Sequence, residues 1–140
     1  MTIIPLSEGT FTIDKTKIFV PFDIEIDDLQ KRPTGSLLVE VQPFVVITSK
    51  DILLIDTGLG FSVNGQLQLH QNLTAQGIHP NEITKVLMSH LHKDHAGGVS
   101  KRDTIGNYHL SCPNAKYYVQ KKEFELAMET GYPSYMTDEF

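Results

Sequence analysis

Residues 89–98 read SHLHKDHAGG and place three histidines and one aspartate within six consecutive positions. Neutral imidazole is the commonest protein ligand for a metal such as zinc, and a carboxylate adds an anionic oxygen. In an extended segment, residues two apart point the same way, so His90 and His92 can bind one ion. Asp94 and His95 follow where the chain must turn, and they can face a second ion. This stretch therefore predicts a site for two metal ions.

Two glycines, Gly97 and Gly98, follow these side chains directly. Glycine lets the backbone bend sharply and pass close to a site, so we expect both to support the metal ligands without binding metal. The alternative is a chance cluster of solvated or core histidines. With only 6 His in the chain, an H-x-H-x-D-H pattern is rare enough to favour the metal site.

Two apolar runs are expected to form strands that end at this site. Residues 85–89 read as a buried strand that delivers His90 at its carboxyl end. Upstream, residues 52–55 are nearly all apolar, which is typical of a strand covered on both faces. That run ends in the glycine-rich turn 56–60. Such a turn often lines a site, and an ordinary turn stabilised by its aspartate is the equal alternative.

The other patterns predict a mixture of strands and short helices. Alternation at 22–26 predicts a strand with a solvated acidic face, and Asn64 is expected to cap a surface helix. The segment 132–135 is expected to be an exposed, mobile tail. The remaining expected elements are strands at 37–41, 44–48 and 115–119, and helices at 65–76, 80–83, 96–100 and 121–130.

Composition limits the class of protein. The chain has 140 residues, enough for one domain with a core, and a formal net charge of −5 without a basic cluster, which argues against a nucleic-acid partner. No apolar run approaches a membrane span, and the N-terminus lacks a signal-peptide pattern. The single cysteine, Cys112, allows no intrachain disulfide. These features predict a soluble, cytoplasmic protein with no membrane partner.

Residues 86–98 and 52–58, in that order and at that interval, resemble the metallo-β-lactamase superfamily closely. The filled H-x-H-x-D-H pattern is more similar to its lactonases and glyoxalase II-type thioesterases than to its antibiotic-degrading members. The resemblance implies an α/β (α+β) fold, an αβ/βα sandwich of two similar halves. Residues 1–140 would be a single partial domain, the N-terminal half, with a mixed sheet and helices on one face.

The resemblance also implies a chemistry. His90 and His92 would bind the first metal ion, Asp94 and His95 the second, and Asp56 would support the site without binding metal. The cofactor would be two zinc ions, with iron or manganese possible. A hydroxide bridging the ions would attack a carbonyl carbon, and Asp94 would act in catalysis by orienting that hydroxide.

Members of the family complete each metal site with residues further along the chain. Residues 1–140 offer two protein groups per ion, whereas catalytic zinc normally takes three. We therefore expect these residues alone to bind metal weakly or not at all, and to be inactive. A half-sandwich also leaves a sheet face bare, which predicts self-association or a missing C-terminal half, as in a truncated or proteolysed form.

Three functions remain open. The leading hypothesis is the N-terminal fragment of a dinuclear zinc hydrolase acting on a small ester, lactone or thioester. The alternatives are a mononuclear-iron sulfur oxidoreductase of the same fold and a non-catalytic truncated interaction module. We expect His70, His79 and His109 to be structural, solvated or plain loop residues, and Cys112 to be structural.

Overall fold

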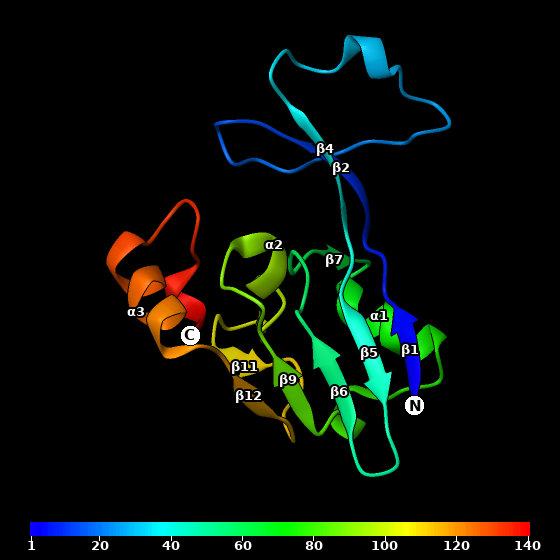
Figure 1. Cartoon of the computed structure of the whole chain (residues 1–140), viewed down its shortest axis with the longest axis vertical. Coiled ribbons are helices and arrows are strands. Elements are labelled where there is room, and N and C mark those ends of the chain that lie inside the picture. The colour runs from blue at the N-terminus through cyan, green and yellow to red at the C-terminus, as the bar shows by residue number, and fades with distance from the viewer.

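The computed structural model describes all of residues 1–140 as a mixed α/β structure with few helices (Figure 1). Its main feature is a mixed five-stranded sheet in the order β1-β5-β6-β9-β12. The first three strands of this order pair antiparallel, and β6, β9 and β12 pair parallel. The strands are β1 Thr2–Pro5, β5 Phe44–Ile47, β6 Ile52–Ile55, β9 Lys85–Leu87 and β12 Lys116–Tyr118.

The parallel pair β6 and β9 positions the two sequence motifs. Leu53 is paired with Lys85 and Ile55 with Leu87, so the carboxyl ends of both strands lie at the same edge of the sheet. Leu54 at the centre of β6 is fully buried, as is the paired Val86. The two runs form adjacent strands as predicted, but the expected burial on both faces is wrong: Leu54 and Val86 are buried, whereas Leu53 and Ile55 are half-buried and Leu87 is exposed. Both motifs follow at the same edge of the sheet.

Helix α1 (Gln68–Ala75) contributes Leu69 and Leu73 to the core, and both are fully buried. The predicted surface helix at 65–76 is therefore wrong about its start and its exposure. Asn64 does not cap it: Asn64 has a φ of 52° and lies in the turn of a hairpin, β7 (Ser62–Val63) with β8 (Gln66–Leu67). Asn and Gly at 64–65 are residues that accept this turn conformation, which takes precedence over capping.

A second, three-stranded sheet projects from the main body, at the top of Figure 1. It comprises β2 (Gly9–Ile13), β3 (Val20–Pro21) and β4 (Leu37–Val41). The strand predicted over 22–26 is wrong. The backbone N–H of Asp23 donates to the Asp27 carboxylate and the N–H of Asp27 donates to the Asp23 carbonyl, which closes a turn instead. Local aspartate hydrogen bonds thus override the alternation.

The other elements are helices and short strands outside the five-stranded and three-stranded sheets. Helix α3 has the predicted bounds and is followed by Gly131. The helix predicted over 96–100 is wrong: α2 covers residues 93–96, and Ser100 begins a strand. In the segment after α3, Tyr132 and Pro133 are exposed as predicted, but Tyr135 is buried, so the prediction of an exposed tail is wrong at that end. No helix is long and apolar enough to span a membrane. These other elements are the helices α2 (Lys93–Ala96) and α3 (Lys121–Thr130), the strands β10 (Ser100–Arg102) and β11 (Tyr108–Leu110), and three 3-10 helices at Leu29–Lys31, Pro80–Glu82 and Thr137–Glu139.

Candidate metal centre

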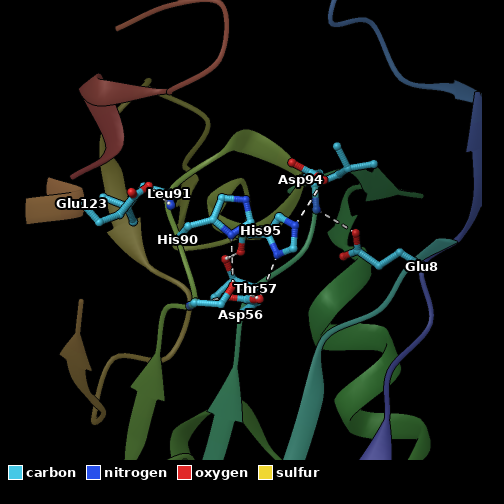
Figure 2. Close-up of polar contacts among 10 residues, drawn as sticks. Glu8, Asp56, Thr57, His90, Leu91, Asp94, His95 and Glu123 are labelled. Carbon is cyan, nitrogen blue, oxygen red and sulfur yellow. Dashed lines mark hydrogen bonds and ion pairs between the residues drawn. The ribbon is translucent and has the colours of Figure 1, made fainter. Parts of the chain in front are cut away.

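The predicted ligands lie between the end of β9 and the first turn of α2, above the carboxyl ends of β6 and β9 (Figure 2). Two backbone hydrogen bonds join the motifs at this point. The N–H of Asp56 donates to the Leu87 carbonyl at 3.0 Å, and the N–H of Thr57 donates to the His95 carbonyl at 2.7 Å. The turn after β6 and the ligand segment after β9 are therefore one rigid unit.

Three of the predicted side chains converge. One ligand atom from each of His90, Asp94 and His95 lies within 4.8 Å of the others. The ring centroids of His90 and His95 are 3.9 Å apart, and Figure 2 shows the two rings side by side, with Asp94 next to His95. Two nitrogen donors and one oxygen donor at this spacing suit a single borderline cation such as zinc.

His92 lies beside this group rather than within it. Its ring centroid is 4.8 Å from that of His90 and 4.9 Å from the ring of Tyr135. The predicted pairing of His90 with His92 thus differs from the grouping seen here, where His90 is closest to His95. The early start of α2 accounts for this: His92 occupies the N-cap position without a side-chain capping bond, and Asp94 and His95 already lie within the helix.

Asp56 takes the supporting position implied by its motif. It is 9% exposed, and its Oδ1 accepts from the Ser89 backbone N–H at 2.8 Å. Its Oδ2 accepts from the Ser89 hydroxyl at 2.6 Å and from Nδ1 of His95 at 2.8 Å. This arrangement leaves Nε2 of His95 for a metal, because a carboxylate on one ring nitrogen fixes the tautomer and orientation of the other.

The electrostatics of the centre favour a cation. Burial lowers the pKa of His95, but hydrogen bonds to Asp56 and Asp94 outweigh it and raise that pKa to about 9. In the metal-free chain, a proton on Nε2, 3.3 Å from Asp94, thus supplies the positive charge that a metal ion would otherwise supply. Burial and the neighbouring histidines lower the pKa of His90, so its imidazole is in the neutral form that binds metals. The donor set therefore fits a divalent ion.

Gly97 and Gly98 allow the two motifs to cross in close contact. A Cβ on Gly97 would collide with the Leu59 carbonyl, and one on Gly98 with the Thr57 carbonyl. The same holds from the other side, where a Cβ on Gly60 would meet the Gly97 carbonyl. Only glycine fits this crossing, which explains the glycines in both motifs.

Two carboxylates that sequence reasoning missed hold the site from opposite sides (Figure 2). Glu123, on α3, accepts from the Leu91 backbone N–H at 2.8 Å, between the first two histidines. Glu8, before β2, accepts from the Leu59 backbone N–H at 2.8 Å. Burial raises the pKa of Glu8 to about 7 against the opposing effect of that hydrogen bond. Neither residue lies in a local pattern, so no sequence signal identifies them.

The segment after α3 closes over the ligand loop. The Lys93 backbone N–H donates to the Ser134 carbonyl at 3.1 Å, next to the contact between Tyr135 and His92. The ligand loop is thus fixed by α3 on one side and by residues 134–135 on another.

The remaining histidines have local roles. His70 is buried and its Nε2 bonds the Ser111 carbonyl at 2.7 Å. His79 caps the 3-10 helix at 80–82, and His109 lies in β11, where its Nε2 is 2.8 Å from Asp103. Cys112 is fully buried, and burial raises the pKa of its thiol to about 11. None of these residues joins the metal group.

Comparisons with known proteins identify the family. The model of the metallo-beta-lactamase superfamily matches residues 38–139. Over 81 residues the chain is 38% identical to the lactamase-like protein notP of Aspergillus sp. (strain MF297-2), which covers 57% of this chain and 23% of that protein.

Two solved structures share the fold. A probable metal-dependent hydrolase from Staphylococcus aureus gives a TM-score of 0.67 at 22% identity, over 93% of this chain and 50% of that one. AidC, a dizinc quorum-quenching lactonase, gives 0.66 at 22% identity, over 92% and 45%. The chain thus spans about half the length of these structures and 23% of the curated relative.

Proposed function

The chain belongs to the metallo-β-lactamase superfamily, and from that premise we propose that the protein is a metal-dependent hydrolase with His90, His92, Asp94 and His95 as ligands. The observation that carries the proposal is the convergence of His90, Asp94 and His95 within 4.8 Å, with the supporting carboxylate of Asp56 bonded to His95. A solvated histidine cluster has no need of a buried carboxylate that orients one of its rings.

We propose two zinc ions as the cofactor, with iron or manganese as alternatives. The mixture of imidazole nitrogen and carboxylate oxygen suits zinc, and one solved structure of the same fold is described as a dizinc enzyme. When bound, such ions polarise a carbonyl and lower the pKa of water to near neutral.

The chain's own residues supply orientation. Asp56 holds Nδ1 of His95, so that Nε2 points to the centre. Burial raises the pKa of Asp94, but the hydrogen bond to His95 outweighs this and lowers it, so Asp94 is ionised at neutral pH. An ionised carboxylate at this point can accept a hydrogen bond from the attacking water and orient it, which is the role we propose for Asp94.

We propose a small ester, lactone or thioester as the substrate. The support is the fold shared with a lactonase and the filled H-x-H-x-D-H motif. The cleavage of each of these substrates needs a water activated next to a polarised carbonyl, which is the chemistry of this donor set.

Four ligands shared by two ions are fewer than the three per ion that catalytic zinc takes. We therefore propose that residues 1–140 alone bind zinc weakly and do not turn over substrate. Apolar side chains stay exposed beside β12, among them Tyr118, Val119 and Phe124. We propose that a second copy, or a C-terminal half of the same domain, covers this region.

Calorimetric titration of zinc into the chain tests the proposed ligands. We expect saturable binding that is lost in His90→Ala and His95→Ala. His109→Ala is the matched control, because His109 is also paired with an aspartate at 2.8 Å yet lies outside the metal group. Equal zinc affinity in all three variants and the parent chain would refute the ligand assignment.

Metal analysis and a hydrolysis assay test the reaction class. A longer form of the protein that carries two zinc ions and cleaves a lactone, ester or thioester would support the proposal. One iron per chain together with oxidation of a sulfur compound would replace it with the oxidoreductase alternative.

A further inference from the structure

Beside the metal group, the projecting sheet and α2 enclose a cavity of about 190 Å³. Its walls on the sheet side are apolar and consist of Ile13, Phe19, Leu37 and Val39. Its other side includes His92 and Asp94, so it opens next to the predicted ligands. A molecule in this cavity would therefore lie against the metal centre.

Two lysines also line this cavity, next to its apolar walls. Lys93 extends from α2, with its Nζ 5.8 Å from the centroid of the Phe19 ring, and Lys17 extends from the turn between β2 and β3. Neither ammonium group lies within 4.0 Å of a carboxylate, because the ion pairs of the structure involve other residues. Two unpaired cations beside apolar walls favour an anion.

The carboxylates near these lysines are engaged elsewhere. Asp94 also lines the cavity, but its Oδ2 faces Nε2 of His95 at 3.3 Å. Asp14, in the same turn as Lys17, accepts hydrogen bonds from the backbone N–H and the hydroxyl of Thr16. Asp94 attracts Lys93 at a distance, but no carboxylate makes a direct ion pair with either lysine, so both ammonium groups are free to contact a bound anion.

The backbone holds Lys17 in an unusual conformation. Its φ is 60°, in the left-handed region that costs energy for a residue with a Cβ. The turn is closed by the Lys17 N–H, which donates to the Asp14 carbonyl at 3.1 Å. Such conformations persist where the surrounding structure fixes them and are concentrated at functional sites.

We propose that this cavity binds the anionic group, carboxylate or phosphate, of a substrate with a small apolar ring or chain, and places it beside the metal centre. Lys17 and Lys93 bind the anion, and the apolar walls contact the body of the molecule. A dry cavity of about 150 Å³ is known to hold a benzene molecule, so this one fits a single ring with its charged group. The inference rests on the proposed function and narrows its substrate class to anionic compounds.

Benzoate and its neutral analogue benzamide test the proposal on the metal-free chain, where no metal can attract the carboxylate. Titrations followed by amide chemical shifts are expected to show benzoate binding at least about fivefold more tightly than benzamide, with shifts at Ile13, Phe19 and Lys93. Added salt should weaken benzoate only. Phenyl phosphate is the parallel probe, and tighter binding of it would identify phosphate as the preferred anion.

Lys17→Met and Lys93→Met should each reduce benzoate affinity to that of benzamide. Lys101→Met is the matched control, because Lys101 is exposed but lines other cavities, and it should leave the preference unchanged. Thermal unfolding of each variant verifies that it is folded.

Three outcomes would overturn the proposal: equal affinity for benzoate and benzamide, an unchanged preference in both cavity variants, or no benzoate binding up to about 20 mM. Because metal is absent, the result is independent of the metal centre. Zinc binding without benzoate binding would reject the anionic substrate alone. Benzoate binding by a protein whose longer form carries no zinc and cleaves no lactone, ester or thioester would reject the hydrolase alone.

Discussion

Replacement of Asp56 by asparagine tests whether one buried carboxylate organises the candidate centre. The amide has nearly the same shape but no charge and only one acceptor oxygen. In the parent chain the carboxylate accepts from the Ser89 N–H, the Ser89 hydroxyl and Nδ1 of His95. The variant therefore loses a charge and leaves at least one of these donors without its partner.

The cost follows from these contacts. Each hydrogen bond to a buried charged group contributes about 1.5–3 kcal/mol, and a donor left unpaired adds a desolvation penalty. For Asp56, which is 9% exposed, we expect Asp56→Asn to lower the free energy of unfolding by about 3 kcal/mol near pH 7. The pKa of His95, now about 9, should fall clearly, because one of its two carboxylates is neutral.

The pH dependence has a defined sign. A histidine whose pKa is raised on folding, here from 6.5 to about 9, stabilises the fold fully below 6.5. This contribution is lost as the pH rises through about 9. The stability difference between the metal-free parent and Asp56→Asn should therefore shrink across that window.

Urea unfolding and imidazole NMR titration measure the two effects. Asp103→Asn is the control, because Asp103 is also 2.8 Å from a histidine, His109, but at an exposed site. There we expect little or no change in stability, because solvent screens an exposed pair. If both variants lose equally little stability and the pKa of His95 stays near 9, Asp56 does not organise the centre.

Three further predictions concern the contacts around the site. Gly97→Ala forces a Cβ against the Leu59 carbonyl and should destabilise the chain by about 2 kcal/mol or more in urea unfolding. Gly106→Ala is the control: its Cβ meets open space, but its φ of +91° should still cost about 1 kcal/mol. Equal costs in the two variants would contradict the close crossing. Burial raises the pKa of Glu8 from 4.5 to about 7, so Glu8 binds a proton more tightly in the folded chain than in the unfolded chain. The parent chain should therefore lose about 2 kcal/mol of stability relative to Glu8→Gln, after solvent screening, as the pH rises between these values. Parallel pH profiles of unfolding for the two chains would rule this out. Glu123→Ala removes the acceptor of the Leu91 N–H, so it should speed hydrogen exchange of that amide and weaken zinc binding about fivefold. Glu125→Ala on the same helix should change neither, because the Glu125 carboxylate lies on the surface, 3.6 Å from Lys121. Unchanged exchange at Leu91 in Glu123→Ala would show that α3 does not hold the loop.

The sequence was most informative where a pattern has a single physical solution. The apolar runs at 52–55 and 85–89 predict strands, and the parallel pairing of β6 and β9 confirms them, although β9 ends at Leu87 and neither strand is buried on both faces. The bounds of α3 were also predictable, because its apolar spacing ends at a glycine. Motif order was enough to identify the family, which the match to residues 38–139 confirms.

The errors came from competing local and distant interactions. The alternation of apolar and acidic residues at 22–26 predicted a strand, but the aspartate side chains hydrogen-bond the nearby backbone and form a turn. A pattern of apolar spacing contains no information about such bonds. The contribution of Glu8 and Glu123 depends on segments that meet only in three dimensions. Tyr135 is buried because it packs on His92, a contact across 43 positions that no local pattern in residues 132–135 indicates.

The glycine crossing has a consequence for anyone who wishes to transplant this centre. The segments 56–60 and 95–98 touch backbone to backbone, so neither has a shape of its own that the other does not help to define. A graft of the histidine loop by itself into another scaffold would carry the ligands without the partner that sets their register. The smallest portable version of the centre is therefore a pair of loops, moved together with the two parallel strands beneath them.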